Sequence, residues 1–151
     1  MRWHYTTYKH HLPKILAAGY IDTTRVGIDE GELAAAWFST DPYFEPTARK
    51  MYSVPGQPPR ELTMDEMHQY AGLVRIGVAD ETAPVSWAGF RVHSGATKKT
   101  IKRLTIAGRK HGANPDNWFA SFEPVPRDTW LSIQKWNGTG WVDLDRSEWE
   151  A

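Results

Sequence analysis

Two short segments of this chain place aromatic rings directly before hydroxyl groups. One reads WHYTT at residues 3–7, and the other reads AWFST at residues 36–40. Histidine can donate a hydrogen bond to a ligand hydroxyl, and tryptophan offers a face on which a flat ring stacks. If both segments are neighbouring strands, we expect them to frame a pocket for a flat polar ligand. The candidate pocket residues are His4, Tyr5, Thr6, Trp37, Phe38 and Ser39.

Each of these residues also has a purely structural interpretation. His4 could simply bind a backbone partner, and the eight tryptophans of the 151 residues could fill the core. Trp37 and Phe38 point to opposite faces of a regular strand, so one of them is expected to pack inward. Ser39 equally suits the position that caps a following helix.

Two charged residues could complete such a site. Glu123 ends a predicted strand, and a carboxylate beside a pocket can stabilise positive charge that develops on a sugar carbon. Its alternative role is a surface residue before Pro124. Arg75 lies within an apolar run and either pairs with a neighbouring group or binds a phosphate through two hydrogen bonds.

Several other chemistries lack their sequence patterns. The chain has no cysteine, which excludes disulfides, thiolate metal sites and a cysteine nucleophile. Its six histidines do not form the H-E-x-x-H pattern of a zinc site. No G-x-G-x-x-G or Walker loop is present, and no G-x-S-x-G elbow indicates a hydrolase. The 18 basic and 18 acidic side chains balance, so any attraction to nucleic acid or membrane needs a local patch.

One such patch follows from the strongest helix prediction, at residues 94–111. An apolar stripe through Ile101 and Leu104 is opposed by a basic stripe that contains no acid. This stripe could neutralise the phosphates of nucleic acid or contact an acidic protein, and its alternative is a solvated helix surface. We call it the basic face; its residues are Lys98, Lys99, Lys102, Arg103, Arg109 and Lys110.

The remaining pattern predicts a single α+β domain over residues 1–151, with a compact mixed sheet of roughly six strands and several helices. Residues 80–93 look irregular, with Trp87 and Phe90 packing inward. No segment has the length and apolarity of a signal peptide or a membrane span, so we expect a cytoplasmic protein without a membrane partner. The predicted strands are 2–7, 33–39, 73–78, 118–122, 129–136 and 141–144; the other predicted helices are 12–18, 44–52 and a short one capped by Thr63 with Glu66.

Three of these segments also resemble a known family. The His-Tyr-Thr run and the L-x-x-I-L-x-x-G-x-I pattern within residues 4–21 resemble the opening of the ADP-ribosyltransferase-like fold. The likeness is nearest to the branch of the DNA-targeting ADP-ribosyltransferase toxins. The AWFST segment followed by residues 47–52 is similar to the second element of that family. The pattern P-V-P-x-x-x-W-L-x-I at residues 124–133 looks like the strand–loop–strand that follows the catalytic glutamate.

This resemblance implies an NAD site. It implies that His4 hydrogen-bonds the ribose of NAD and that the neighbouring backbone holds the nicotinamide amide. Trp37 or Tyr52 would stack on nicotinamide, and Glu123 would be the catalytic carboxylate. Arg75 would hold a pyrophosphate or an acidic substrate. The chain departs from the family where the glutamate is expected to begin its strand, because that place falls near Asn117.

Three hypotheses about function follow. In the first, the domain binds NAD or a related nucleotide and transfers ADP-ribose to a nucleic acid or protein acceptor. In the second, the same fold binds a ligand or blocks a partner without catalysis, as the displaced glutamate suggests. In the third, the chain is a protein–protein adaptor whose tryptophans all belong to the core.

Overall fold

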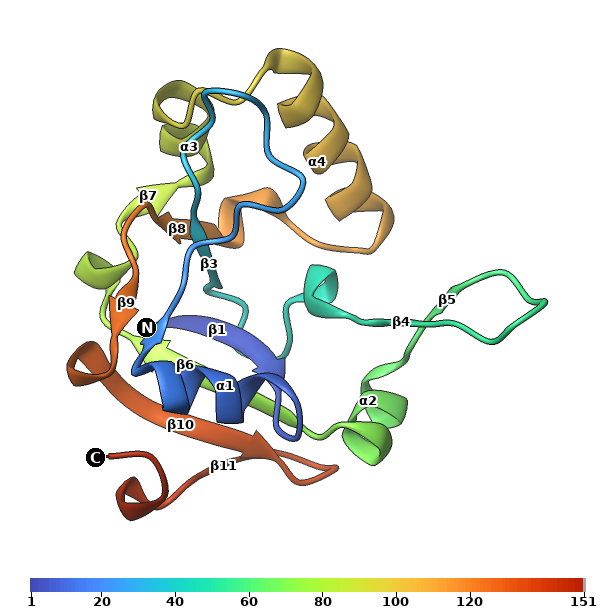
Figure 1. The fold of residues 1–151 in the computed structure, drawn as a ribbon, viewed down its shortest axis with the longest axis vertical. Helices are drawn as coiled ribbons and strands as arrows, with labels where there is room; N and C mark the ends of the chain where they lie inside the picture. Colours follow the sequence, from blue (N-terminus) through green and yellow to red (C-terminus); the bar gives the residue numbers. More distant parts are fainter. Residues whose placement is uncertain (151) are drawn as a thin grey trace.

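A seven-stranded sheet organises residues 1–150, which are the residues described by the computed structural model (Figure 1). The α+β class is therefore confirmed. The sheet is larger than expected, and it is antiparallel at every pairing rather than mixed. Its order is β11-β10-β6-β1-β3-β8-β7. The strands are β1 (Arg2–Thr7), β3 (Ala36–Ser39), β6 (Leu73–Val78), β7 (Val85–Ser86), β8 (Trp118–Ser121), β10 (Trp130–Trp136) and β11 (Trp141–Asp143).

Four helices and two small ribbons accompany this sheet within the described residues. The first ribbon pairs β2 with β9, and the second pairs β4 with β5. The helices are α1 (His11–Ala18), α2 (Met64–Tyr70), α3 (Trp87–His93) and α4 (Lys98–Lys110); the ribbon strands are β2 (Tyr20–Ile21), β9 (Val125–Pro126), β4 (Met51–Tyr52) and β5 (Arg60–Glu61).

The sheet has two parts that meet weakly. β1 pairs with β6 along its whole length, but it pairs with β3 only at Trp3 and Ser39. The part made of β11, β10, β6 and β1 carries α1 on one face, where Leu12 packs with Val74 and Ile76. The part made of β3, β8 and β7 lies with α3 and α4 at the top of Figure 1. Beyond this single pairing, β1 and β3 form no further ladder pairs.

The helix expected at residues 94–111 is shorter, because α4 covers only Lys98–Lys110, and a second helix, α3, precedes it. Gly95 has φ +81°, a conformation that glycine adopts easily, and the chain turns there between α3 and α4. Thr97 then caps α4 by accepting a hydrogen bond from the backbone N–H of Thr100. The irregular stretch expected at residues 80–93 contains α3, whose Trp87 and Phe90 are buried as predicted.

The helix expected at residues 44–52 was wrong. That segment contains only the single 3₁₀ turn η1 (Pro46–Ala48), after which the chain becomes extended in β4. Glu45 ends the preceding loop and caps η1, accepting a hydrogen bond from the backbone N–H of Thr47. The extended chain continues into an arm, residues 49–62, that projects from the body of the molecule beside α2 (Figure 1).

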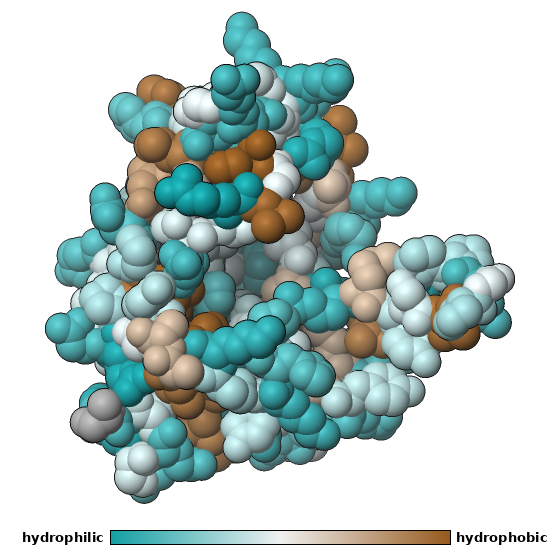
Figure 2. Space-filling view, in the orientation of Figure 1, coloured by the Kyte–Doolittle hydropathy of each residue, from teal (hydrophilic) through white to brown (hydrophobic). Residues whose placement is uncertain are grey.

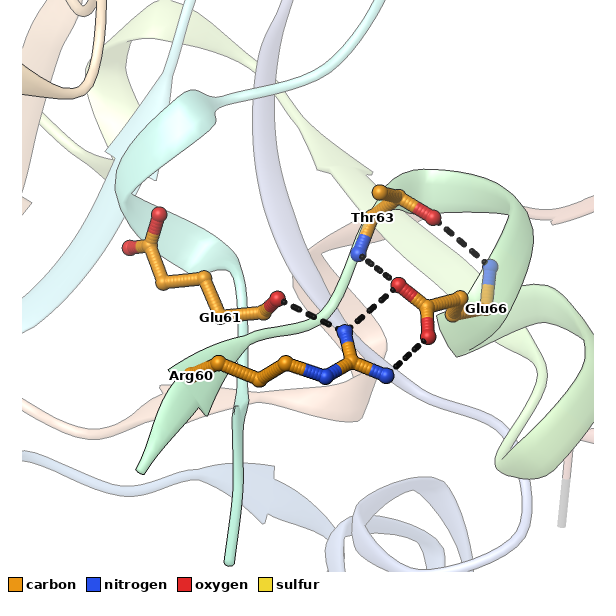
Figure 3. Close-up of polar contacts among 4 residues, drawn as sticks. All are labelled: Arg60, Glu61, Thr63 and Glu66. Carbon is orange, nitrogen blue, oxygen red and sulfur yellow. Dashed lines mark hydrogen bonds and ion pairs between the residues drawn. The ribbon is translucent and has the colours of Figure 1, made fainter. Parts of the chain in front are cut away.

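An ion pair holds the base of this arm (Figure 3). Both terminal nitrogens of Arg60 donate to the Glu66 carboxylate, at 2.9 and 2.6 Å. Glu66 also completes the predicted capping box, in which Thr63 and Glu66 each accept from the backbone N–H of the other. The pKa of Glu66 is lowered to about 2, and the hydrogen bonds from Arg60 contribute most to this shift. The arm is therefore fastened to the first turn of α2.

Candidate functional site

A pocket of about 500 Å³ lies where β1 and β3 separate. Figure 2 shows the surface hollowed at this place, between the part that carries α4 and the part that carries β1. Its walls come from β1, β3, the loop of residues 24–32, the η1 turn, α3 and α4, with Trp118 of β8. A volume of this size is typical of sites for small ligands and cofactors. We call it the central pocket.

His4 is held at the point where the two strands part. Its Nδ1 lies 2.8 Å from the backbone carbonyl oxygen of Trp37. A carbonyl oxygen only accepts, so Nδ1 carries the proton and Nε2 of a neutral ring is left with a lone pair. Among residues 1–150, Nε2 has no hydrogen-bond partner and is not sealed from solvent. The side chain of His4, a residue that lines the central pocket, therefore keeps one free hydrogen-bond acceptor, Nε2.

The surroundings of His4 favour its neutral form. Burial lowers the pKa of His4 below its usual value of 6.5, and the positive charge of Lys50 adds to this effect. The hydrogen bond to Trp37 opposes the shift but does not reverse it. At neutral pH the ring is therefore an acceptor at Nε2 and not a cation. This differs from the donor role that the sequence suggested for His4.

The rings of His4 and Trp37 lie on opposite faces of their strands. His4 lies on the same strand face as Phe38, with ring centroids 5.6 Å apart. Trp37 alternates to the other face of β3, where its ring lies 4.6 Å from Phe90 and 6.1 Å from Trp87. Both Trp37 and His4 line the central pocket because the sheet opens between their strands. The rings of His4 and Trp37 lie on opposite strand faces, so they cannot sandwich one flat group.

The buried carboxylate among the residues that line the central pocket belongs to Glu45, which the sequence did not single out. Glu45 lines the pocket and is only 7% exposed. Ser39 donates its hydroxyl proton to Oε1 at 3.0 Å, and Thr47 donates to Oε2 through its backbone N–H and its hydroxyl. The only local signal is an acid shortly after the AWFST segment. Sequence alone gives no reason to separate this acid from those at the surface.

The hydroxyl groups of Ser39 and Tyr5, which were expected to meet a ligand, form hydrogen bonds with other residues of the protein. Ser39 lines the central pocket, but its proton goes to Glu45 and its oxygen accepts from the backbone of Asp41. Tyr5 also lines the pocket and donates its hydroxyl proton to the carbonyl of Asp41. Burial is the main cause that raises the pKa of Tyr5 to about 12, so the hydroxyl stays protonated. Thr6 is buried and does not border the pocket.

Three of the expected site residues lie elsewhere. The side chain of Glu123 is exposed outside the central pocket, and its backbone forms a turn with the Ser121 hydroxyl. Tyr52 is on the arm, where its ring stacks on Tyr70 at 6.2 Å. Arg75 belongs to β6, its side chain is buried, and it does not line the pocket. None of these three residues lines the central pocket.

Arg75 is a structural cation. Its guanidinium group lies 3.9 Å from the ring centroid of Trp3 and 4.6 Å from that of Trp141. It donates to the side-chain oxygen of Gln134, the carbonyl oxygen of Pro42 and the hydroxyl of Tyr5. These neutral acceptors use the hydrogen-bonding capacity that a phosphate would need. Arg75 therefore joins β6 to β10 and to the loop before η1.

The basic face of α4 lies at the rim of the central pocket. Arg103 lines the pocket, and all six residues of the basic face are exposed. Within residues 1–150, none of the six forms an ion pair. At the other end of α4, His111 lines the pocket and lies 3.0 Å from Glu61 of β5. One wall of the pocket is thus positively charged and tied to the arm.

Comparison of the chain with protein families, with curated proteins and with solved structures finds no match. Within the described residues, no three His, Asp or Glu side chains come together in a way that could hold a metal ion. No helix among them combines the length and the apolarity needed to cross a membrane.

Proposed function

We propose that the central pocket binds NAD or a related nucleotide. The observation that carries this proposal is the imidazole of His4, which lines the central pocket and is held through Nδ1 by the carbonyl oxygen of Trp37, so that its Nε2 can accept a hydrogen bond from a ligand hydroxyl such as that of a ribose. The ring of Trp37 and the neighbouring aromatic wall suit a flat ring. The indole N–H of Trp118, which also lines the pocket, is buried without a partner among residues 1–150 and could serve a polar ligand atom. These features support a ligand with both a sugar and a ring.

The reaction that fits such a site is transfer of ADP-ribose from NAD to an acceptor. The bond between nicotinamide and ribose breaks, and positive charge develops on the sugar carbon, where a nearby carboxylate stabilises it. We do not assign this step to Glu123, whose side chain is exposed outside the central pocket. We propose a nucleic acid as the preferred acceptor and an acidic protein as the alternative, since the basic face reaches the pocket rim at Arg103.

Tryptophan fluorescence tests the binding proposal. NAD is titrated to millimolar concentration against the wild-type protein, His4→Ala and the control His93→Ala, whose side chain is exposed on α3. We expect saturable quenching in the wild type and in His93→Ala, and affinity about tenfold weaker in His4→Ala, a factor in keeping with one lost hydrogen bond. Absence of quenching in the wild-type protein contradicts the proposal.

A non-catalytic binding protein is the second candidate function. It is favoured by the exposed position of Glu123, the residue that the family resemblance implied for catalysis. Nicotinamide release during prolonged incubation with NAD separates the two functions. Steady release at a rate that depends on the central pocket selects the transferase, and saturable binding without release selects the binding protein.

A further inference from the structure

The connection between β10 and β11, residues 137–140, places an asparagine amide directly before a glycine. Asn137 is exposed, and Gly138 has φ +101°, a conformation that suits glycine. Gly138 has no Cβ atom to shield its backbone nitrogen, and within residues 1–150 its N–H donates no hydrogen bond. A free backbone nitrogen therefore adjoins the side-chain carbonyl of Asn137 along the chain.

Three hydrogen-bond donors hold the side-chain oxygen of Asn137. The backbone N–H groups of Thr139 and Gly140 both donate to Oδ1 at 2.8 Å, and the hydroxyl of Thr139 donates to it at 3.0 Å. Attack of a nucleophile on the amide carbon would place negative charge on this oxygen. Donors that are already in position stabilise such a charge, as they do in the oxyanion hole of an enzyme.

A histidine from a different element lies against the same glycine. A Cβ atom added at Gly138 would be 3.5 Å from Nε2 of His68, a residue of α2. Nδ1 of His68 is buried without a partner among residues 1–150, whereas Nε2 is not sealed from solvent. When Nε2 carries the lone pair of the neutral ring, it can accept a proton from a neighbouring N–H group. His68 and Asn137 also line a common cavity of about 380 Å³, which is large enough to admit water.

Two charged residues line the same cavity, and both have other partners. The ammonium group of Lys135 lies 3.8 Å from the ring centroid of Tyr8. The carboxylate of Asp143 accepts a hydrogen bond from Nε2 of Gln134 at 3.0 Å. His68 is therefore the side chain of this cavity that is best placed to take a proton from Gly138.

We propose that Asn137 is a site of self-catalysed deamidation, with His68 as the base. The nitrogen of Gly138 forms a bond with Cγ of Asn137 and passes its proton to His68. The bond between Cγ and Nδ2 then breaks, and His68 returns the proton to Nδ2, which leaves as ammonia. Water opens the resulting succinimide and gives aspartate or isoaspartate at position 137. The reaction needs neither NAD nor the central pocket.

Peptide mass spectrometry after prolonged incubation in isotope-labelled water tests this proposal, because each deamidation brings one oxygen atom from water into the peptide that contains position 137. We expect the folded wild-type protein to react about tenfold faster than the guanidinium-unfolded chain, since only the fold positions the donors and the base. His68→Gln is expected to remove this advantage. The matched control Asp143→Asn, which removes a charge from the same cavity and keeps an acceptor oxygen, should leave the rate unchanged.

Two outcomes would overturn the proposal. A folded rate equal to or below that of the unfolded chain would show that the fold does not promote the reaction. Equal rates in the wild type and in folded His68→Gln would exclude His68 as the base. Thr139→Val removes the hydroxyl donor from an exposed residue and should slow the folded reaction several-fold, so an unchanged rate contradicts the role of that donor. If His68→Gln does not fold, the ratio of folded to unfolded rates in the wild type decides.

Discussion

The imidazole of His4 donates to the backbone carbonyl of Trp37 across the gap between β1 and β3. Beyond the pairing of Trp3 with Ser39 the two strands no longer form a regular ladder. A side chain therefore takes over one hydrogen bond that the backbone no longer makes. The same contact fixes the tautomer of His4 and leaves Nε2 at the central pocket. The residue that bridges the opening of the sheet is thus also the residue proposed to meet the ligand.

The first prediction concerns pH. Since burial lowers the pKa of His4 in the folded protein, Nε2 stays an acceptor at neutral pH and loses this capacity only below the usual value of 6.5. We expect NAD affinity to be constant from neutral pH down to that value and to fall at lower pH. Titrations of wild type and His4→Gln check this. A pH dependence that is identical in both proteins excludes His4 as its source.

The same shift affects stability. The folded protein binds a proton at His4 less readily than the unfolded chain, so the unfolded chain takes up the proton first as the pH falls. The contribution of His4 to stability is complete above pH 6.5, and it declines as the pH falls from there towards the lowered pKa of the folded state. Urea unfolding at several pH values measures this decline, and His4→Gln is expected to reduce it.

The second prediction concerns the contact of α4 with β8. A Cβ atom added at Gly108 would lie 2.4 Å from the ring of Trp118, whereas one at Gly89 of α3 meets only ordinary contacts. Gly108→Ala is expected to lower the free energy of unfolding by about 1–2 kcal/mol, because overpacking exceeds the gain in helix propensity. Gly89→Ala is the control and should be neutral or stabilising. Equal stability of both variants would show that α4 can move away from Trp118.

The third prediction concerns Arg75. Arg75→Met keeps much of the side-chain length but leaves the oxygens of Gln134 and Pro42 without their donor. We expect a loss of about 3 kcal/mol in the free energy of unfolding, since buried acceptors lose their partners. Chemical denaturation measures this loss. NAD affinity of the folded variant should stay unchanged, and a selective loss of affinity without a loss of stability would return Arg75 to the ligand site.

The fourth prediction concerns the arm. Glu66→Gln removes the ion pair with Arg60 and weakens the capping box. We expect trypsin to cut the arm several-fold faster, with cleavage at Arg49, Lys50 and Arg60 followed by mass spectrometry. The pKa of Glu66 is lowered to about 2, so its contribution is present above the usual value of 4.5 and is lost as the pH falls towards 2. Cleavage rates that match the wild type would show that other contacts hold the arm.

The fifth prediction concerns the basic face. Lys102→Glu and Lys110→Glu change exposed residues of α4, and Lys9→Glu changes an exposed residue outside that helix. If a single-stranded nucleic acid is the partner, log affinity falls with log salt by about 0.7 for each phosphate contact. Fluorescence anisotropy should give a smaller salt slope for both α4 variants and an unchanged slope for Lys9→Glu. Equal slopes in all variants exclude the basic face as the binding surface.

Local signals predicted several elements correctly. The apolar run at residues 73–78 became the fully buried strand β6, and the capping box of Thr63 with Glu66 begins α2. The strands predicted at residues 129–136 and 141–144 became β10 and β11, which pair with each other. These elements depend on hydrophobic pattern and turn chemistry within a few residues, which the sequence carries directly.

The candidate site depended on contacts that a local pattern cannot report. Placement of His4 and Trp37 at one pocket follows from a single pairing between β1 and β3. Glu45 was missed because its partner Ser39 becomes visible only when the loop folds back on the strand. The sequence left two roles open for Arg75, because Trp3, Trp141 and Gln134 surround it from three different strands. Such long-range neighbours decide whether a polar residue supports the fold or meets a ligand.

The most direct test of the central claim is a crystal structure of the protein soaked with oxidised NAD. The account predicts electron density for the dinucleotide in the central pocket, with a ribose hydroxyl within hydrogen-bond distance of His4 Nε2. Density for NAD at another surface, or a central pocket that stays empty at saturating NAD, would contradict it.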